Sequence, residues 1–311
     1  MATTISQNAS LLQEYGTIVC VDVSYVAYHA LYSAVKKWTD ESPMASVLDD
    51  VDTEDPNFTQ VDITAYPDFV EVLKEKAITS FSKISTMVDD FNKTNCSSTL
   101  GNMICVMDPP KGSKLKSWRY VIYPEYKGNR AASRDKKPFD VRKAFCKFTD
   151  LIMEESFKSR FGLDFVYADG CEADDLVALY LMDESNASAK KFLVASDKDY
   201  LQLEGVTQMT LEGKQVEIEQ PYPDLITLTP ETYLLAKIIT GDTSDNIPHI
   251  FNGVAYKKAV KKYVANMQFL TESLENDAIA LKNFKLNTRL IDFKRIPKSV
   301  RQIGRRVLGL E

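Results

Sequence analysis

Residues 17–24 read TIVCVDVS, a short run of β-branched and apolar residues that is typical of a buried strand and contains an aspartate near its end. Three further apolar runs have the same character: MICVMD at 103–108, DFVYAD at 164–169 and KFLVAS at 191–196. Between them, apolar residues recur with helical spacing over 67–93 and 139–161, and a helix is expected from Glu172 onward. Strands that alternate with helices predict an α/β fold with a mainly parallel central sheet flanked by helices.

Three other segments complete the expected organisation. Residues 40–66 are acidic and carry little apolar pattern, which predicts a loop or an insertion. Residues 207–219 predict a hairpin with its turn at Glu212-Gly213. From Pro230 onward the pattern is helical, so the C-terminal region is expected to be a helical unit.

Composition limits the chemistry of the chain. It has only two histidines, His29 and His249, which argues against most zinc hydrolases and against nucleophiles that need an imidazole base. The five cysteines are widely spaced, which favours buried free thiols over a disulfide framework. No apolar run is long enough to span a bilayer and the first residues lack the pattern of a signal peptide, so we expect a soluble, intracellular protein without membrane contact.

The net charge of −6 hides a strong segregation of charge along the chain. Residues 40–71 hold ten acidic and no basic residues, whereas residues 111–147 hold twelve basic and three acidic ones. Residues 257–310 are again basic, with thirteen Lys or Arg against four acids. Two basic surfaces on an acidic protein favour a nucleic-acid partner, although ordinary solvated faces are the alternative if charge is taken alone.

Acidic residues follow three of the expected strands. Asp22, Asp108 and Asp197 each lie at the carboxyl end of an apolar run. In a parallel sheet these ends share one edge, so the three side chains are expected to converge there. A single aspartate after a strand is often only a turn or cap residue, but three in this position favour a site.

Three short motifs add further carboxylates. Glu172-Ala173-Asp174-Asp175 opens a helix, where acids also compensate the helix dipole, but three so close together repel one another unless a cation lies among them. The motifs SDKD at 196–199 and GDTSDN at 241–246 contribute Asp199, Asp242 and Asp245. Nine acids exceed the needs of one magnesium ion and predict two, held close enough to clamp a phosphate group.

The motifs VDVS (21–24), YPEYKGNR (123–130), CEADD (171–175), SDKD (196–199) and GDTSDN (241–246) together resemble the 5′-3′ exonuclease and flap endonuclease family, in its bacteriophage branch. Their order and spacing agree with that family from about residue 16 to 298. The resemblance implies a PIN-like 5′-nuclease fold with an α/β catalytic domain at 1–229, a helical arch at about 115–150 and a duplex-binding helical region at 230–311. It also implies the cytoplasm of a phage-infected host cell as the location.

The resemblance further implies a role for each matching residue. Around a first magnesium ion it places Asp22, Asp108, Glu172, Asp174 and Asp197, and around a second Asp175, Asp199, Asp242 and Asp245. Manganese is expected to substitute for magnesium. Lys127 and Arg130 would reach the scissile phosphate from the arch and Arg119 would lie near it; a solvated face is the alternative for the first two.

DNA contacts are also implied. Tyr126 is similar to an aromatic residue on which a terminal base stacks, with core packing as the alternative. Asn246 is also expected to contact DNA. The family often binds duplex backbone through a potassium ion at a Gly-x-Gly hairpin, and this chain departs from that pattern because it has only Gly253 there. The backbone contacts would then come from four lysines: Lys257, Lys258, Lys261 and Lys262.

The function implied is structure-specific cleavage of branched or flap DNA, or RNase H-like removal of RNA from RNA–DNA hybrids, by a monomer that works beside replication proteins. The sequence does not decide between exonuclease and flap-endonuclease preference. Two other classes are alternatives. A haloacid-dehalogenase-type phosphatase also carries a Gly-Asp-x-x-Asp-Asn motif, but it needs Asp-x-Asp after the first strand, where this chain has Asp22-Val23-Ser24. A branched-DNA binding module without catalysis is the other.

Overall fold

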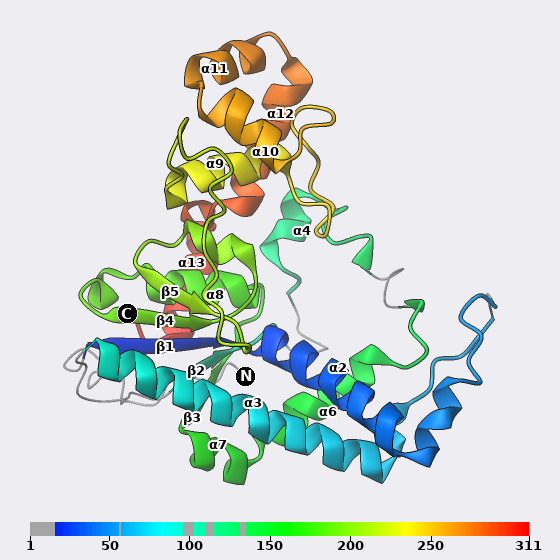
Figure 1. Cartoon of the computed structure of the whole chain (residues 1–311). Coiled ribbons are helices and arrows are strands. Elements are labelled where there is room, and N and C mark those ends of the chain that lie inside the picture. Colours follow the sequence, from blue (N-terminus) through cyan, green and yellow to red (C-terminus); the bar gives the residue numbers. More distant parts are fainter. Residues whose placement is uncertain (1–15, 56, 96–102, 110–114, 131–134, 311) are drawn as a thin grey trace.

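The computed structural model describes residues 16–55, 57–95, 103–109, 115–130 and 135–310. Five parallel strands form one sheet in the order β3-β2-β1-β4-β5 (Figure 1). The strands are β1 (Thr17–Asp22), β2 (Met103–Val106), β3 (Leu163–Val166), β4 (Lys190–Val194) and β5 (Val206–Met209). The α/β class and the four expected strands are therefore confirmed, with β1 at the centre of the sheet.

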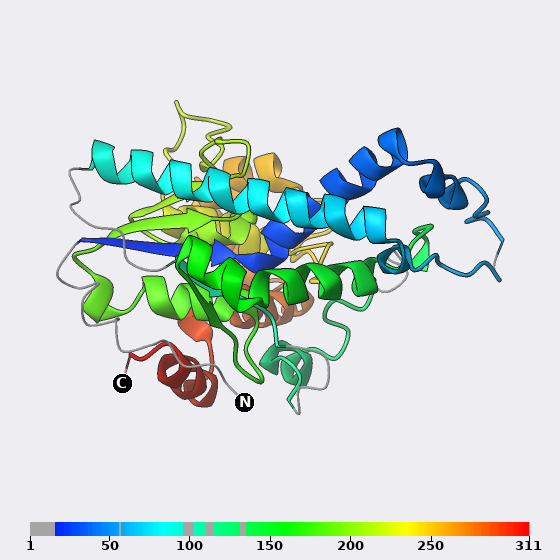
Figure 2. The ribbon, with the colours of Figure 1, turned by 90° about the horizontal axis from the view of Figure 1, so that it is seen from below.

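Helices cover both faces of the sheet because side chains alternate along each strand. In β1, Val19 and Val21 face one core, and Ile18 and Cys20 face the other. The first core is covered by four helices, seen from below in Figure 2: α2 (Val23–Glu41), α3 (Pro67–Thr94), α6 (Val141–Met153) and α7 (Glu155–Phe161). The second core is covered by α8 (Ala173–Leu181), the short η6 (Phe293–Arg295) and α13 (Lys298–Val307).

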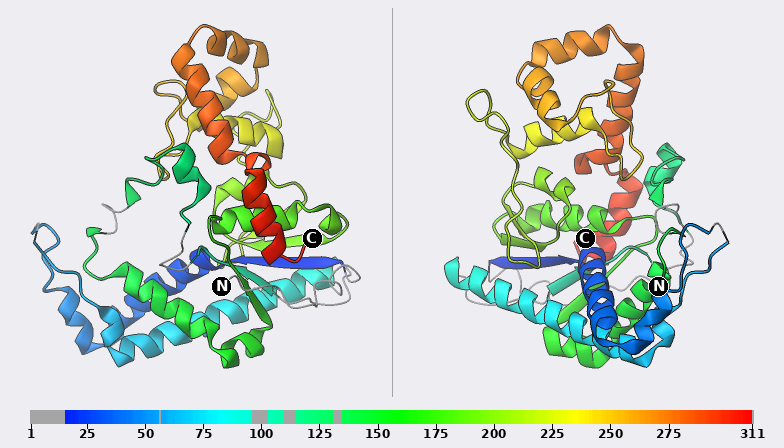
Figure 3. Two further views of the ribbon diagram at one scale, coloured as in Figure 1. Left: turned by 180° about the vertical axis from the view of Figure 1, so that it is seen from behind. Right: turned by 45° about the vertical axis from the view of Figure 1, so that its right-hand side comes forward.

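The C-terminal helices form a third core of their own, above the sheet in the view of Figure 1. They are α9 (Pro230–Thr240), α10 (Tyr256–Ala259), the π-helix η5 (Val260–Val264), α11 (Met267–Glu275) and α12 (Ala278–Ile291). The short helix α4 (Trp118–Ile122) lies beside this unit, and the chain then descends toward α6 (Figure 3). The expected helical region after Pro230 is confirmed.

The hairpin expected at 207–219 is present but short. β5 pairs in parallel with the free edge of β4, and the chain then folds back on β5 through the antiparallel bridge from Met209 to Gln215 and a hydrogen bond from the Thr210 amide to the Lys214 carbonyl. Its turn is the expected one, with Gly213 at a φ of 76°. The acidic insertion contains two 3-10 helices, η1 (Pro43–Leu48) and η2 (Ile63–Ala65), and bridges to the chain at Phe139.

Two further short helices connect the second half of the sheet. They are η3 (Glu184–Asn186), which follows α8, and η4 (Lys198–Gln202), which follows β4. No helix in the described part of the chain is both long and apolar enough to cross a membrane.

Candidate active site

Asp22 lies where β1 ends and α2 begins. Its carboxylate caps α2 by accepting a hydrogen bond from the Tyr25 amide at 3.2 Å, and it accepts a second one from the Tyr200 hydroxyl at 3.1 Å. Burial raises the pKa of Asp22 to about 6, and the nearby charge of Asp108 adds to this rise. A buried carboxylate beside another one favours a cation in the same space.

The aspartates after the two neighbouring strands also fix local structure. Asp108 accepts a hydrogen bond from the Ala173 amide at 2.9 Å, which ties the end of β2 to the start of α8. Asp197 caps η4 through the Asp199 amide at 2.9 Å. Burial raises the pKa of Asp197, and Asp22 is among the charges that raise it further. The strand-end aspartates thus lie within electrostatic reach of one another, as the sequence predicts.

Glu172 caps the N-terminus of α8 and is the meeting point of this sheet edge with residues 115–130, the first part of the predicted arch. The Lys127 ammonium lies 2.7 Å from Glu172 Oε1, and the guanidinium of Arg119 lies 2.8 Å from Oε2. Burial opposes ionisation of Glu172, but the two cations outweigh it and hold the pKa of this carboxyl below its usual value. Lys127 therefore reaches the carboxylate cluster from the segment that the sequence identifies.

Arg119 is only 2% exposed, and its burial does not fit the phosphate contact predicted for it. Besides Glu172, its guanidinium contacts Asp174 at 3.3 Å and Asp175 at 3.0 Å, and it donates a hydrogen bond to the Leu290 carbonyl. The residue is therefore a buried counter-charge that joins α4, α8 and α12. Sequence alone does not separate this role from a phosphate contact, because both require an arginine near acids.

Asp175 is fully buried, which does not fit a metal ligand either. Its Oδ2 accepts hydrogen bonds from the Trp118 indole and the Glu172 amide, both at 2.9 Å. Its Oδ1 lies 3.0 Å from the Arg119 guanidinium as an ion pair and accepts no hydrogen bond, so protein encloses the whole carboxylate. Asp175 closes the capping box of α8 and positions Glu172. Asp174, one residue before it, remains partly open to solvent, and burial raises its pKa despite the charge of Arg119.

Tyr126 is 2% exposed and packs in the core of the C-terminal helices. Its hydroxyl oxygen lies 2.9 Å from a carboxylate oxygen of Glu172 and 2.9 Å from one of Asp245, and its single proton donates to one of the two. The structure thus gives this ring the environment of the alternative, core packing, with no open face for a stacked base. The residue instead links the α8 carboxylates to the GDTSDN turn.

The arch segment docks on that turn through its backbone and side chains. The Lys127 amide donates to the Asp245 carbonyl at 2.9 Å, and the Asn246 side chain donates to the Glu125 carbonyl at 2.9 Å. The guanidinium of Arg130 pairs with Asp245 and is 47% exposed. Asn246 therefore holds the segment that carries Lys127 and Arg130, and the structure gives it a positioning contact rather than a free amide.

A lysine that the sequence reasoning missed joins the remaining acids. Lys237, in the last turn of α9, contacts Asp199 at 2.7 Å and Asp242 at 3.1 Å. Burial and the charge of Asp197 raise the pKa of Asp199 to about 6, although Lys237 opposes the rise. The signal that could have revealed Lys237 is its position one helical turn before Gly241-Asp242.

The donor set fits hard divalent ions, because it consists of carboxylate oxygens. In the described residues, however, no group of three or more His, Cys, Asp and Glu side chains is arranged to hold a metal ion as it stands. Cationic side chains meet many of these acids instead: Arg119, Lys127, Arg130 and Lys237. An ion in this cluster would need some of these contacts to open.

The four lysines predicted to contact duplex backbone are all exposed, on α10 and the π-helix η5. Lys257 makes an ion pair with Glu219 at 3.4 Å, and Lys262 lies over the Tyr263 and Phe269 rings. Gly253 precedes them in an open turn with a φ of 66°. The exposure is compatible with the predicted contact, which stays a prediction.

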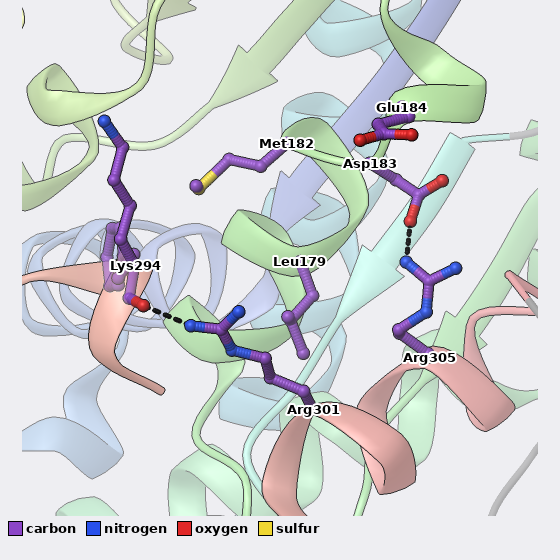
Figure 4. Close-up of a pocket in the computed structure, with 8 residues that line it drawn as sticks. Leu179, Met182, Asp183, Glu184, Lys294, Arg301 and Arg305 are labelled. Carbon is purple, nitrogen blue, oxygen red and sulfur yellow. Dashed lines mark hydrogen bonds and ion pairs between the residues drawn. The ribbon is translucent and has the colours of Figure 1, made fainter. Parts of the chain in front are cut away.

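A cavity of about 320 Å³ lies apart from these residues, between α8, η6 and α13 (Figure 4). Arg305 pairs with Asp183 at its rim, and Arg301 donates to the Lys294 carbonyl. This cavity is lined by none of the acids or lysines predicted for the site. These contacts fasten α13 to α8 and η6.

A family model described as the 5′-3′ exonuclease N-terminal resolvase-like domain matches residues 61–223, just over half of the chain. DNA polymerase I of Mycobacterium bovis is 30% identical over 171 residues, which are 53% of this chain and 18% of the polymerase. The 5′-3′ exonuclease of Buchnera aphidicola is 25% identical over 187 residues, 56% of this chain and 62% of the relative. The chain thus spans less than two thirds of these relatives.

Solved structures share the fold over nearly the whole chain. The flap endonuclease of bacteriophage T5, in a pseudo-enzyme-product complex with DNA and metal ions, superposes with a TM-score of 0.55 at 16% identity, over 94% of this chain and 98% of the phage protein. The T5 5′-exonuclease with bound zinc gives a TM-score of 0.54 at 17% identity, over 94% and 99%. Both similarities are similarities of the fold, and both extend over nearly the whole chain.

Proposed function

This chain belongs to the 5′-3′ exonuclease family, and from that premise we propose that it is a structure-specific 5′-nuclease that hydrolyses phosphodiester bonds in branched DNA. The observation that carries the proposal is the meeting of Lys127 with Glu172 at 2.7 Å, because it joins the arch to the carboxylates at the sheet edge. The T5 relative in complex with DNA and metal ions supports a DNA substrate and a divalent cofactor.

We propose two magnesium ions as the cofactor, replaceable by manganese. The first would be held by Asp22, Asp108, Glu172, Asp174 and Asp197, and the second by Asp199, Asp242 and Asp245. When bound, such ions supply an activated water and neutralise charge on the phosphate. Asp175 and Arg119 are left out of these sets because both are buried in protein contacts.

The protein's own cations have separate tasks in this proposal. Lys127 and Arg130 leave Glu172 and Asp245 to contact the scissile phosphate, where negative charge grows in the transition state. Tyr126 and Asn246 hold the arch segment against the GDTSDN turn while this exchange occurs. The lysines of α10 and η5 bind the duplex backbone, outside the reacting centre.

A time course on 5′-end-labelled flap DNA tests the function. We expect cleavage in magnesium or manganese, none in excess chelator, and none from the Asp22→Asn variant, which removes one charge without removing volume. A parallel RNA–DNA hybrid tests whether RNA removal belongs to the activity. Undiminished cutting in chelator would refute the metal-dependent mechanism.

The same assay addresses the other classes. Binding of the flap without cleavage, in any divalent metal, would favour a branched-DNA binding module. Hydrolysis of a generic phosphomonoester without cleavage of DNA would favour the phosphatase. The division at residues 229 and 230, the monomeric state and contact with replication proteins stay predictions.

A further inference from the structure

Lys237 occupies the space between two of the acids proposed for the second ion. Its ammonium lies 2.7 Å from Asp199 Oδ1 and 3.1 Å from Asp242 Oδ2. These acids come from different elements, since Asp199 lies in η4 and Asp242 follows α9. The lysine is thus the contact that draws the loop after β4 and the turn after α9 together.

We propose that the ammonium of Lys237 is the resident cation of Asp199 and Asp242, and that a divalent ion reaches this pair only by displacing it. The inference rests on the proposed function, because it concerns the second ion of that site. It makes Lys237 a positioning residue that lowers the affinity of the second ion site more than that of the first.

The charge balance explains why the lysine is there. Asp197, Asp199 and Asp242 raise one another's energy when ionised, because their negative charges lie close together. A single ammonium only 18% exposed relieves this repulsion without metal, and it therefore competes with any ion for the same oxygens. Lys127 is the comparable cation at Glu172, but it comes from the predicted arch. We expect it to leave Glu172 and contact the phosphate when the substrate binds.

The displaced side chain has a place to go. A cavity of about 330 Å³ lies beside Lys237 and is also lined by Glu217 and Glu219. Both glutamates are exposed, so they offer alternative partners at little desolvation cost, with Glu219 then shared between Lys237 and Lys257. A lysine that moves between two sets of carboxylates would couple occupation of the second site to a change in this cavity.

The experiment is a titration of the full chain with manganese, without DNA, followed by calorimetry and by electron paramagnetic resonance of the free ion. Lys237→Met removes the charge and keeps the length of the side chain. Lys237→Arg keeps the charge. Lys198→Met is the matched control, because Lys198 is an exposed lysine of η4 that lines the same cavity and contacts neither acid in any ion pair of the described residues. Thermal unfolding verifies that each variant is folded.

We expect wild type to bind one ion tightly and a second one weakly. Lys237→Met should tighten the second ion by about tenfold or more, because a like charge has left the site, while the affinity for the first ion should change much less. Lys198→Met should resemble wild type, and Lys237→Arg should keep the second ion weak. Unchanged or weaker binding of the second ion in a folded Lys237→Met protein would overturn the inference.

The titration also separates this inference from the proposed function. If wild type already binds two equally tight ions and cuts flap DNA, only the role of Lys237 falls. If wild type binds no manganese and cuts no DNA, both fall. An equal gain from Lys198→Met would mean that general surface charge, and not occupation of the acid pair, sets the affinity.

Discussion

Two residues of the site carry an unusual backbone. Lys127 and Asn246 have φ angles of 55° and 59°, in the left-handed region that side chains other than glycine rarely adopt. Both lie where the arch segment meets the GDTSDN turn, and each contributes a hydrogen bond to that contact. Backbone strain of this kind persists only where the surroundings enforce it, and it often marks a functional site.

Removal of the arch cations should slow chemistry more than binding. Lys127→Ala or Arg130→Ala would each remove stabilisation worth about 3 kcal/mol from the transition state, or about a hundredfold in single-turnover rate. Binding of flap DNA should weaken far less, since the α10 and η5 lysines remain. Rapid-quench rates beside binding isotherms make the distinction. Two variants that cut at the wild-type rate would remove both residues from the mechanism.

Substitution of Arg119 should lower the free energy of unfolding more than substitution of Arg130, although both side chains pair with acids. Arg119→Met removes a buried counter-charge from Glu172, Asp174 and Asp175, of which Glu172 keeps Lys127, and should cost about 3–5 kcal/mol of unfolding free energy. Arg130→Met removes an exposed pair with Asp245 and should cost about 1 kcal/mol or less. Urea unfolding of the two variants in chelator measures both. Equal losses would show that Arg119 is not a structural counter-charge.

At the scale of elements, strand and helix positions were predictable because their patterns are local. Asp22, Asp108 and Asp197 were placed at one sheet edge from apolar runs alone, and the structure has them there. The burial of Arg119 was not predictable, because it depends on α12, which lies far away in sequence; the sequence offers the burial of Tyr126 only as an alternative, since the C-terminal core decides it. The parallel pairing of β5 likewise depends on the free edge of β4.

The acidic insertion contacts residues 137–143, the second part of the predicted arch, and holds them in place. The Val61 amide donates to the Pro138 carbonyl and the Asp140 amide to the Val61 carbonyl, both at 2.9 Å. The side-chain amide of Gln60 donates to the carbonyls of Lys137 and Phe139 at 2.9 and 3.1 Å. Asp62 adds an ion pair with Lys143 at 2.8 Å. These contacts give one part of an otherwise acidic loop a structural task.

Weakening this contact should loosen the arch without unfolding the sheet. Gln60→Glu exchanges a donor for an acceptor that faces two carbonyls, so amide hydrogen exchange at Asp140 should accelerate by about tenfold. Asp50→Asn is the control, because Asp50 is an exposed acid of the same insertion away from these bonds. Exchange at β1 should be unchanged in both. If Asp140 exchanges at the wild-type rate in Gln60→Glu, the insertion does not hold the arch.

On the scale of the whole molecule, charge is separated in space as it is in sequence. The acidic insertion projects from the far ends of α2 and α3, whereas the lysines of α10 and η5 lie in the C-terminal unit (Figures 1 and 3). The carboxylate cluster lies between these two ends, at the sheet edge below α4. A polyanion attracted to the C-terminal unit and repelled by the insertion would be oriented across the cluster.

The salt dependence of duplex binding tests whether the C-terminal lysines contact the backbone. Each phosphate contact contributes about 0.9 to the slope of log K against log salt concentration, so changing Lys257, Lys258 and Lys261 to Ala together should flatten the slope by about two to three units. The matched control changes Lys74, Lys83 and Lys93 of α3, which are equally exposed and lie on the opposite face of the sheet from the C-terminal unit. Each trio contains one lysine that is already ion-paired, Lys257 with Glu219 and Lys93 with Asp90, so the two variants are matched in both total and ion-paired charge lost.

Fluorescence anisotropy of a labelled duplex at a series of salt concentrations gives both slopes. Equal slopes in the two variants would mean that net charge alone attracts DNA, and the C-terminal unit would then have no duplex-binding role.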